Sequence, residues 1–158
     1  MDTSFDMFIE TDVPESELII SRTDLKGNIT YVNETFAMIS GYEADELIGK
    51  THNIVRHPDM PKSIYKDLWE TIQSGKSWQG FVKNRRKDGG YYWVNAEISG
   101  VYKDDKLVEY KSLRIPVEKE TKVITQNRYD EMRKEEEGNY RVILYVNEKE
   151  LQEIEKIL

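Results

Sequence analysis

Two short strand-forming runs lie near the start of the chain, at positions 18–21 and 29–32, and every residue of the second is β-branched or aromatic. Gly27 lies between them in a polar stretch. Strand-forming runs separated by a glycine-containing turn are typical of a β-hairpin. The pattern therefore predicts two antiparallel strands, preceded by an acidic lead-in segment at 1–17.

Polar residues at helix-starting positions and glycines at helix-ending positions mark the next segment. Asn33 stands where a helix N-cap is expected, and the apolar residues after it end at Gly41. A second short helix fits residues 43–47, which Gly49 closes. Residues 50–61 are too polar for a core and contain two prolines, so we expect a loop with at most one helical turn.

The clearest helical pattern follows this loop. Apolar residues recur from Ile64 to Ile72 at i, i+1, i+4, i+5 and i+8, which is one face of a helix. We expect Asp59 or Met60 to cap this helix, with Pro61 in its first turn and an end near Gly75.

Beyond residue 78 the hydrophobic period changes to two. Strands are expected at 81–86, 91–102 and 106–117, joined by Asp- and Gly-containing turns at 88–90 and 104–105. Five strands with short helices inserted after the second predict an α+β fold. It consists of a five-stranded antiparallel sheet with the helices on one face.

The C-terminal part follows a different pattern. Residues 118–137 are charged and contain no glycine, which predicts a helix with a thin apolar stripe that ends at Gly138. A short strand at 140–146 and a capped helix from Asn147 are expected after it. We therefore divide the chain into a lead-in (1–17), a central domain (18–117) and a C-terminal extension (118–158).

Composition limits the chemistry of the chain. Its 158 residues include 23 basic and 30 acidic side chains, a net charge of −7, and no cysteine. The absence of cysteine excludes disulfides, thiolate metal sites and a cysteine nucleophile. Negative charge disfavours nucleic-acid binding, no apolar run approaches the roughly 20 residues of a membrane helix, and the acidic start is unlike a secretory signal. A cytoplasmic protein that does not span a membrane is expected.

The densest candidate chemistry lies in residues 51–61. Both histidines, His52 and His57, occur there with Arg56 and Asp59. One interpretation is a solvated loop in which Asp59 caps the following helix. The other is a clamp for an anionic cofactor, because arginine donors suit phosphate. A metal site is disfavoured by the spacing and by the proline after His57, and no catalytic triad or phosphate-binding glycine motif is present.

Aromatic residues are abundant around the predicted helix at 64–72 and the strands that face it. Most aromatics at strand spacing are core residues. Trp78, Asn84 and Asn95 nevertheless place an indole and two amides beside apolar surface. A flat heteroaromatic ring needs this combination of apolar faces and polar edge partners. The basic run at 83–87 is expected to point partly to solvent.

The segments TDLKGNITYVNETFAMISGYEADELIG and GKTHNIVRHPDMPKSIYKDLWETIQSGKSWQGFVKNRRKDGGYYWV resemble a PAS sensor domain. More narrowly, they resemble the flavin-binding PAS domain of the bacterial aerotaxis (energy taxis) receptor family. The resemblance covers residues 18–117. It implies an FAD bound without a covalent link, no enzymatic turnover, and transfer of the flavin redox state to a methyl-accepting chemotaxis receptor or another signalling protein.

The resemblance also implies a set of cofactor-binding positions. These are Asn33, His52, Arg56, His57, Asp59, Tyr65, Trp69, Trp78 and Asn84. In this interpretation Arg56 and His57 face the FAD pyrophosphate, and a change at the ring near Asn84 or Trp78 reaches the helix after Val117. The missing thiol excludes the flavin–cysteine adduct of light-sensing LOV domains.

Two alternatives remain open from the residues. One is a haem-binding PAS gas sensor with His52 or His57 as the axial ligand. The other is a PAS interaction module without a cofactor, which could form a homodimer or bind a partner protein.

Overall fold

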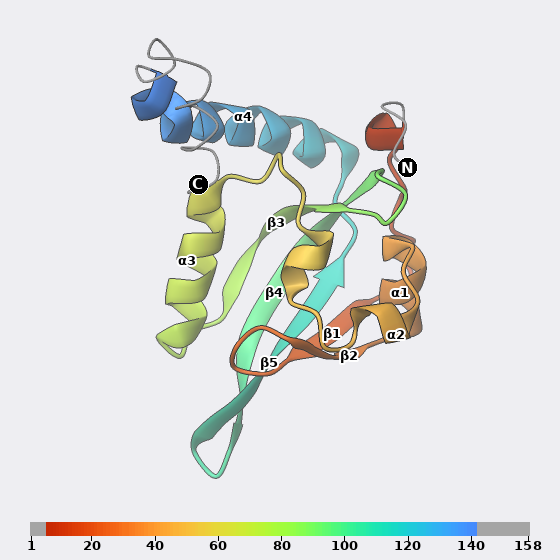
Figure 1. Cartoon of the computed structure of the whole chain (residues 1–158), viewed down its shortest axis with the longest axis vertical. Helices are drawn as coiled ribbons and strands as arrows, with labels where there is room; N and C mark the ends of the chain where they lie inside the picture. Colours follow the sequence, from red (N-terminus) through yellow and green to blue (C-terminus); the bar gives the residue numbers. More distant parts are fainter. Residues whose placement is uncertain (1–5, 142–158) are drawn as a thin grey trace, which may run out of the picture.

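The computed structural model describes residues 6–141 and is organised around one antiparallel sheet (Figure 1). The sheet order is β2-β1-β5-β4-β3, and every neighbouring pair is antiparallel. Its strands are β1 (Ile19–Thr23), β2 (Ile29–Val32), β3 (Trp78–Arg85), β4 (Tyr91–Lys103) and β5 (Lys106–Ile115). The predicted fold class and the five strands predicted for the sheet are confirmed, with ends that differ by a few residues.

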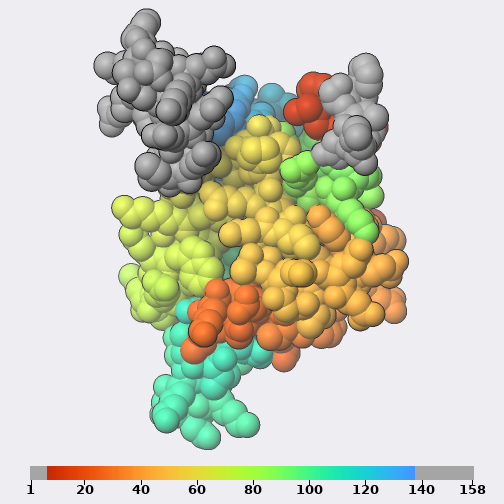
Figure 2. Space-filling model, in the orientation of Figure 1, coloured from red at the N-terminus to blue at the C-terminus, as the bar shows by residue number. Residues whose placement is uncertain are grey.

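The helices between β2 and β3 lie over one face of this sheet (Figure 1). They are α1 (Glu34–Ser40), α2 (Ala44–Leu47), the 3-10 turn η2 (His52–Val55) and α3 (Lys62–Gln73). A further 3-10 turn, η1 (Asp6–Phe8), lies near the N-terminus, and α4 (Lys119–Arg141) follows the sheet. Figure 2 views the face on which segment 50–61 and α3 lie side by side.

Two local predictions about helix ends hold in detail. Asn33 has extended backbone angles and its side chain accepts a hydrogen bond from Phe36 N, which makes it the N-cap of α1. Gly41 ends α1 in the left-handed conformation, with φ of 78°. Asn33 also accepts from Ile20 N and donates to Leu18 O, so its amide ties α1 to the start of β1.

The start of α3 differs from the prediction. Pro61 is the N-cap residue, and neither Asp59 nor Met60 caps the helix. The cap comes instead from α4. The Glu136 carboxylate accepts hydrogen bonds from Lys62 N at 3.0 Å, from Ser63 N at 2.9 Å and from Ser63 Oγ at 2.5 Å. A carboxylate at a helix N-terminus satisfies free N–H groups and opposes the positive end of the helix dipole.

The C-terminal helix is longer than predicted. Gly138 was expected to end it, but α4 continues through Gly138 to Arg141, so the strand expected at 140–146 is wrong at its first two residues. A single glycine costs a helix only about 1 kcal/mol, which neighbouring turns can outweigh. The remainder of that strand and the helix expected from Asn147 lie outside the described residues.

Helix α4 packs on the opposite face of the sheet from α3. Side chains alternate along β3 and β4, so Trp93 and Lys83 face away from the covered side on which Tyr92 and Val94 lie. Tyr129 of α4 is 4% exposed, stacks on Trp93 and donates its hydroxyl to Phe81 O at 2.5 Å. Tyr129 is therefore the main anchor of α4 on the sheet, and Met132 also packs against the core, whereas Ile124 is exposed.

No helix within residues 6–141 is long and apolar enough to cross a lipid bilayer.

Candidate functional site

An interior cavity of about 90 Å³ lies between α3 and the sheet. The α3 side is apolar, and it is formed by Leu68, Trp69 and Ile72 with Tyr65 at the edge. The sheet side includes Ile98 and Tyr110, but it is the more polar wall because the inward positions of β1 and β5 also carry small hydroxyl residues and an arginine. These are Ser21, Thr23, Ser112 and Arg114. An apolar wall that faces a polar one suits a flat ring with polar atoms on one edge.

Arg114 is the main buried charge of this cavity. The residue is 5% exposed, and burial lowers the pKa of its guanidinium. Its Nε donates to Ser112 Oγ at 2.8 Å, so one neighbour is a neutral hydroxyl. The residues that line the cavity include Arg56, Lys111 and Arg114 but no aspartate or glutamate. A buried cation without an acidic partner is costly, and an electron-rich ligand would offset that cost.

Asn84 connects Arg114 to the loop before α3. With its amide oriented so that both ends are satisfied, its oxygen accepts from Arg114 Nη1 at 2.8 Å and its nitrogen donates to Val55 O at 3.3 Å. The backbones of Asn84 and Arg56 also form a bridge. The edge strand β3 therefore holds both the buried arginine and residues 50–61, which we call the η2 loop, in position.

His52 lines the same cavity and is held neutral. Its Nε2 lies 2.9 Å from Ser21 Oγ, and its ring packs edge-on against Phe36. Burial, with the nearby charge of Arg114, lowers the pKa of His52 to about 3. A neutral imidazole beside Arg114 can donate or accept a hydrogen bond without adding a second positive charge.

A second, wider hollow lies between the η2 loop, the start of α3 and α4. We call it the basic groove. Its volume is about 600 Å³, and it shares Asn53 and Arg56 with the interior cavity. Four cationic residues and two carboxylates line it: Arg56, Lys62, Arg85 and Arg133 with Glu136 and Glu137. His57, Pro58 and Met60 complete the lining.

Arg56 lies at the junction of the cavity and the groove. Its guanidinium lies over the ring of Tyr65, 3.9 Å from the ring centroid, which fixes the plane of the guanidinium. Burial raises the pKa of Tyr65, so its phenol stays protonated. A stacked guanidinium keeps its edge N–H groups available for an anion at this junction.

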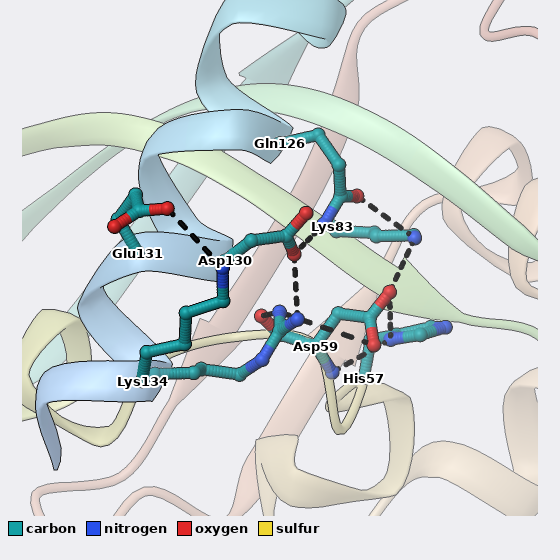
Figure 3. Close-up of polar contacts among 8 residues, drawn as sticks. His57, Asp59, Lys83, Gln126, Asp130, Glu131 and Lys134 are labelled. Carbon is teal, nitrogen blue, oxygen red and sulfur yellow. Dashed lines mark hydrogen bonds and ion pairs between the residues drawn. The ribbon is translucent and has the colours of Figure 1, made fainter. Parts of the chain in front are cut away.

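Asp59 links the η2 loop to β3 and α4, and Figure 3 shows its carboxylate pointing toward Lys83. Lys83 Nζ donates to Asp59 Oδ2 at 2.7 Å and to Gln126 Oε1 at 3.0 Å. Burial alone would raise the pKa of Asp59, but the bond from Lys83 and the nearby positive charges leave that pKa below its usual value. Arg133 of α4 donates to the backbone oxygen of Asp59.

His57 lies beside this cluster and is 6% exposed. Its Nδ1 accepts from Asp59 N at 3.0 Å, and its ring packs edge-on against Tyr91. Burial and the charge of Lys83 lower the pKa of His57 to about 4, although Asp59 acts in the opposite direction. His57 is therefore neutral near pH 7, so any anion in the groove would meet arginine and lysine charges rather than an imidazolium.

The structure brings most, but not all, of the candidate site residues together. The interior cavity is lined by His52, Arg56, Tyr65 and Trp69, and the basic groove by Arg56 and His57. Asn84 reaches the cavity through Arg114. Asn33 and Asp59 line neither space. Asn33 caps α1, and Asp59 binds Lys83.

Trp78 also lies outside both spaces. Its indole nitrogen donates to Asp67 Oδ2 of α3 at 3.0 Å, and its ring covers Gly80, where a Cβ atom would lie 2.4 Å from the ring. Trp78 therefore fastens α3 to the edge strand.

Sequence reasoning missed Arg114. The residue sits two positions after Ser112 and four after Tyr110, all three buried on the covered side of β5. Period-two alternation, anchored on an aromatic residue expected to be buried, would have placed this arginine inside the domain.

Among residues 6–141, no three His, Asp or Glu side chains come together in an arrangement that could hold a metal ion.

The five-stranded sheet with helices over one face defines the architecture, and comparison with known proteins gives the family. Residues 29–113, more than half of the chain, match the family model described as PAS fold. The chain belongs to the PAS family.

Two curated relatives are similar over the same region. The chain is 45% identical over 104 residues, 66% of its length, to the aerotaxis receptor of Escherichia coli strain K12. It is 31% identical over 100 residues, 63% of its length, to the nitrogen fixation regulatory protein of Klebsiella pneumoniae. The matched region spans 21% and 20% of these relatives, so the chain corresponds to about a fifth of each.

Solved structures support the fold. A light-oxygen-voltage domain studied with a flavin analogue has a TM-score of 0.64 and 19% identity, covering 73% of this chain and 90% of that one. The light-state structure of the blue-light photoreceptor Aureochrome1 LOV has a TM-score of 0.63 and 19% identity, covering 71% and 91%. At this identity the likeness concerns the fold.

Proposed function

We propose that this PAS domain binds FAD without a covalent link and reports the redox state of the flavin to a signalling partner. The observation that carries the proposal is the buried guanidinium of Arg114, in a cavity whose lining contains no carboxylate. The similarity to the aerotaxis receptor supports the same function. When bound, FAD would supply reversible electron transfer, and the protein would supply the environment that makes the two redox states different.

The interior cavity suits the isoalloxazine ring. Its apolar wall on α3 would face the ring plane, and the hydroxyls of Ser21 and Ser112 with the Arg114 guanidinium would face its polar edge. Reduction increases the electron density on that edge. A nearby buried cation interacts more strongly with the electron-rich form, which raises the affinity for reduced flavin relative to oxidised flavin.

The basic groove favours FAD over FMN. A ring in the cavity would place the rest of the ligand past Arg56, which lines both spaces. The groove offers cationic residues from the η2 loop, α3, β3 and α4, and far more volume than the cavity. Arginine forks suit the oxygens of a pyrophosphate, and a groove of this size suits the adenosine half of a dinucleotide.

The cavity volume implies that α3 moves when a ligand enters. About 90 Å³ is below the roughly 300–1,000 Å³ that is common for ligand pockets. The sheet wall is continuous and hydrogen-bonded, whereas Trp69 on α3 is 36% exposed and packs edge-on against Tyr110. A ring would therefore widen the cavity by displacing the exposed side of α3.

Helix α4 is a direct output route for a change in the cavity. Arg114 contacts Asn84 of β3, whose neighbour Lys83 binds both Asp59 and Gln126. A shift of β3 would alter these contacts on α4. In this proposal the sensor domain spans residues 18–117 and catalyses no substrate turnover. It acts in the cytoplasm on a chemotaxis-type receptor or another signalling protein.

The test is to heat the purified full chain under conditions that release non-covalent flavins and to identify the released compound. The proposal expects FAD, together with the flavin double absorption band before heating. An intense Soret band that disappears when His52 or His57 is substituted would establish the haem alternative instead. A colourless protein that stays colourless after incubation with FAD would establish the cofactor-free alternative.

A further inference from the structure

We propose that Arg133 of α4 is part of the dinucleotide site, so that FAD loading and the docking of α4 on the domain stabilise each other. The inference rests on the proposed function and adds a residue from outside the region that matches the PAS family, which ends at residue 113. It also predicts that the two halves of FAD act on different parts of the protein.

The first observation is that α4 forms one wall of the basic groove. Arg133, Glu136 and Glu137 line the groove opposite Arg56 and Arg85, which come from the η2 loop and β3. The side chain of Arg133 retains 25% of its exposure. A ligand in the groove would therefore contact the sensor domain and the C-terminal helix at the same time.

The second observation concerns the charges on this wall. Glu136 is engaged by the N-terminus of α3, and these hydrogen bonds outweigh burial and hold the pKa of its carboxyl below the usual value. Arg133 Nη2 lies 2.5 Å from Asp130 Oδ1, but its contact with the Asp59 carboxylate is longer, at 4.0 Å. The guanidinium is thus positioned by two acidic residues and reaches the groove with part of its edge exposed.

The third observation is that Arg133 is hydrogen-bonded to the η2 loop. It donates to the backbone oxygen of Asp59, two residues from His57, which also lines the groove. A phosphate group held between Arg56 and Arg133 would bridge the loop and α4. A ligand that binds only when α4 is docked on the domain stabilises the docking of α4. By the same factor, the docking of α4 raises the affinity for that ligand.

The experiment compares ligands that share the isoalloxazine ring but differ in the rest. The equilibrium dissociation constants of FAD and riboflavin are measured for the full chain, for Arg133→Gln and for Arg128→Gln. Arg128 is an exposed arginine on the same helix that does not line the groove, so it controls for loss of positive charge on α4. Hydrogen exchange of residues 119–137 is measured without ligand and with each ligand bound.

We expect Arg133→Gln to weaken FAD binding by about tenfold and to leave riboflavin binding unchanged, because one charge-assisted contact to phosphate is lost. Arg128→Gln should match the unaltered chain with both ligands. FAD should slow hydrogen exchange in α4 more than riboflavin does, because only FAD places a phosphate beside Arg133.

Three results would overturn the inference. If the unaltered chain binds FAD and Arg133→Gln binds it equally well, the inference fails while the proposed function stands. An equal loss of affinity for both ligands would show that Arg133 acts only by supporting the fold. If the unaltered chain binds neither flavin, the proposed function itself fails.

Discussion

The buried guanidinium of Arg114 allows the sharpest prediction about cofactor binding. Arg114→Met removes the charge but keeps a long side chain of similar reach, which limits the empty space that is left. A charge-assisted hydrogen bond contributes about 1.5–3 kcal/mol, and about 1.4 kcal/mol corresponds to a tenfold change in affinity. We therefore expect the dissociation constant for FAD to rise by about 10–150-fold.

The assay measures the free energy of unfolding by urea denaturation, with and without FAD. At a free ligand concentration 100 times the dissociation constant, binding stabilises the folded state by about 2.7 kcal/mol. At the same concentration, a variant with tenfold weaker binding gains only about 1.4 kcal/mol. The comparison uses the gain caused by the ligand, so a change in the stability of the ligand-free variant cancels.

Arg22→Met is the matched control. Arg22 lies on β1, the strand that pairs with β5, but its guanidinium forms an exposed ion pair with Glu109 at 3.3 Å. Its loss should leave the FAD-induced gain unchanged, because exposed ion pairs contribute little. If Arg114→Met retained the full gain, the assignment of the interior cavity as the flavin site would be refuted.

Three further predictions concern the framework of the site. Glu136→Gln should lower the free energy of unfolding, measured by urea denaturation, by about 1 kcal/mol, because it weakens the cap of α3. Glu137→Gln is the control and should leave that free energy unchanged. Equal losses in the two variants would contradict the role of Glu136 as the cap. Both histidines have a pKa lowered by burial, to about 3 and about 4, so only the unfolded chain takes up their protons as the pH falls below about 6.5. The free energy of unfolding of the ligand-free chain should therefore decrease from pH 6.5 to about 4, by at most about 1.4 kcal/mol per histidine and pH unit. His52→Asn should show a smaller decrease, and an identical pH dependence would contradict the buried neutral state. Tyr129→Phe should lower the free energy of unfolding by about 1 kcal/mol and speed hydrogen exchange in α4, because the hydroxyl bond to Phe81 O is lost. Tyr102→Phe, at a half-exposed position, should change neither quantity. Unchanged exchange in Tyr129→Phe would contradict the docking of α4 through the Tyr129 hydroxyl.

The sheet and its covering helices were predictable because each depends on local patterns. Alternation in 91–102 and the turn at 104–105 give β4 and its hairpin, where Asp104 and Asp105 have φ of 52° and 62°. The Asn33 cap follows from the same local chemistry. Contacts between distant segments were not predictable in this way: the cap of α3 comes from Glu136, which lies 74 positions beyond Lys62.

The candidate site was predictable only in part, for a related reason. The four candidates in 51–61 are close in sequence, so their grouping was visible, and three of them, His52, Arg56 and His57, line the described spaces. Arg114 joins them only because β5 pairs with β1 and β4 in the centre of the sheet. Trp78 was a candidate because its indole lies near apolar surface, but in the structure its indole nitrogen donates to Asp67 of α3.

The structure of the full chain saturated with FAD would test the account most directly. The account predicts the isoalloxazine ring between Trp69 and the Arg114 side of the sheet, with its polar edge within hydrogen-bond distance of the guanidinium. It also predicts the pyrophosphate beside Arg56 in the basic groove. A ring located anywhere outside the interior cavity, or a cavity closed around Arg114 while FAD is bound elsewhere, would contradict it.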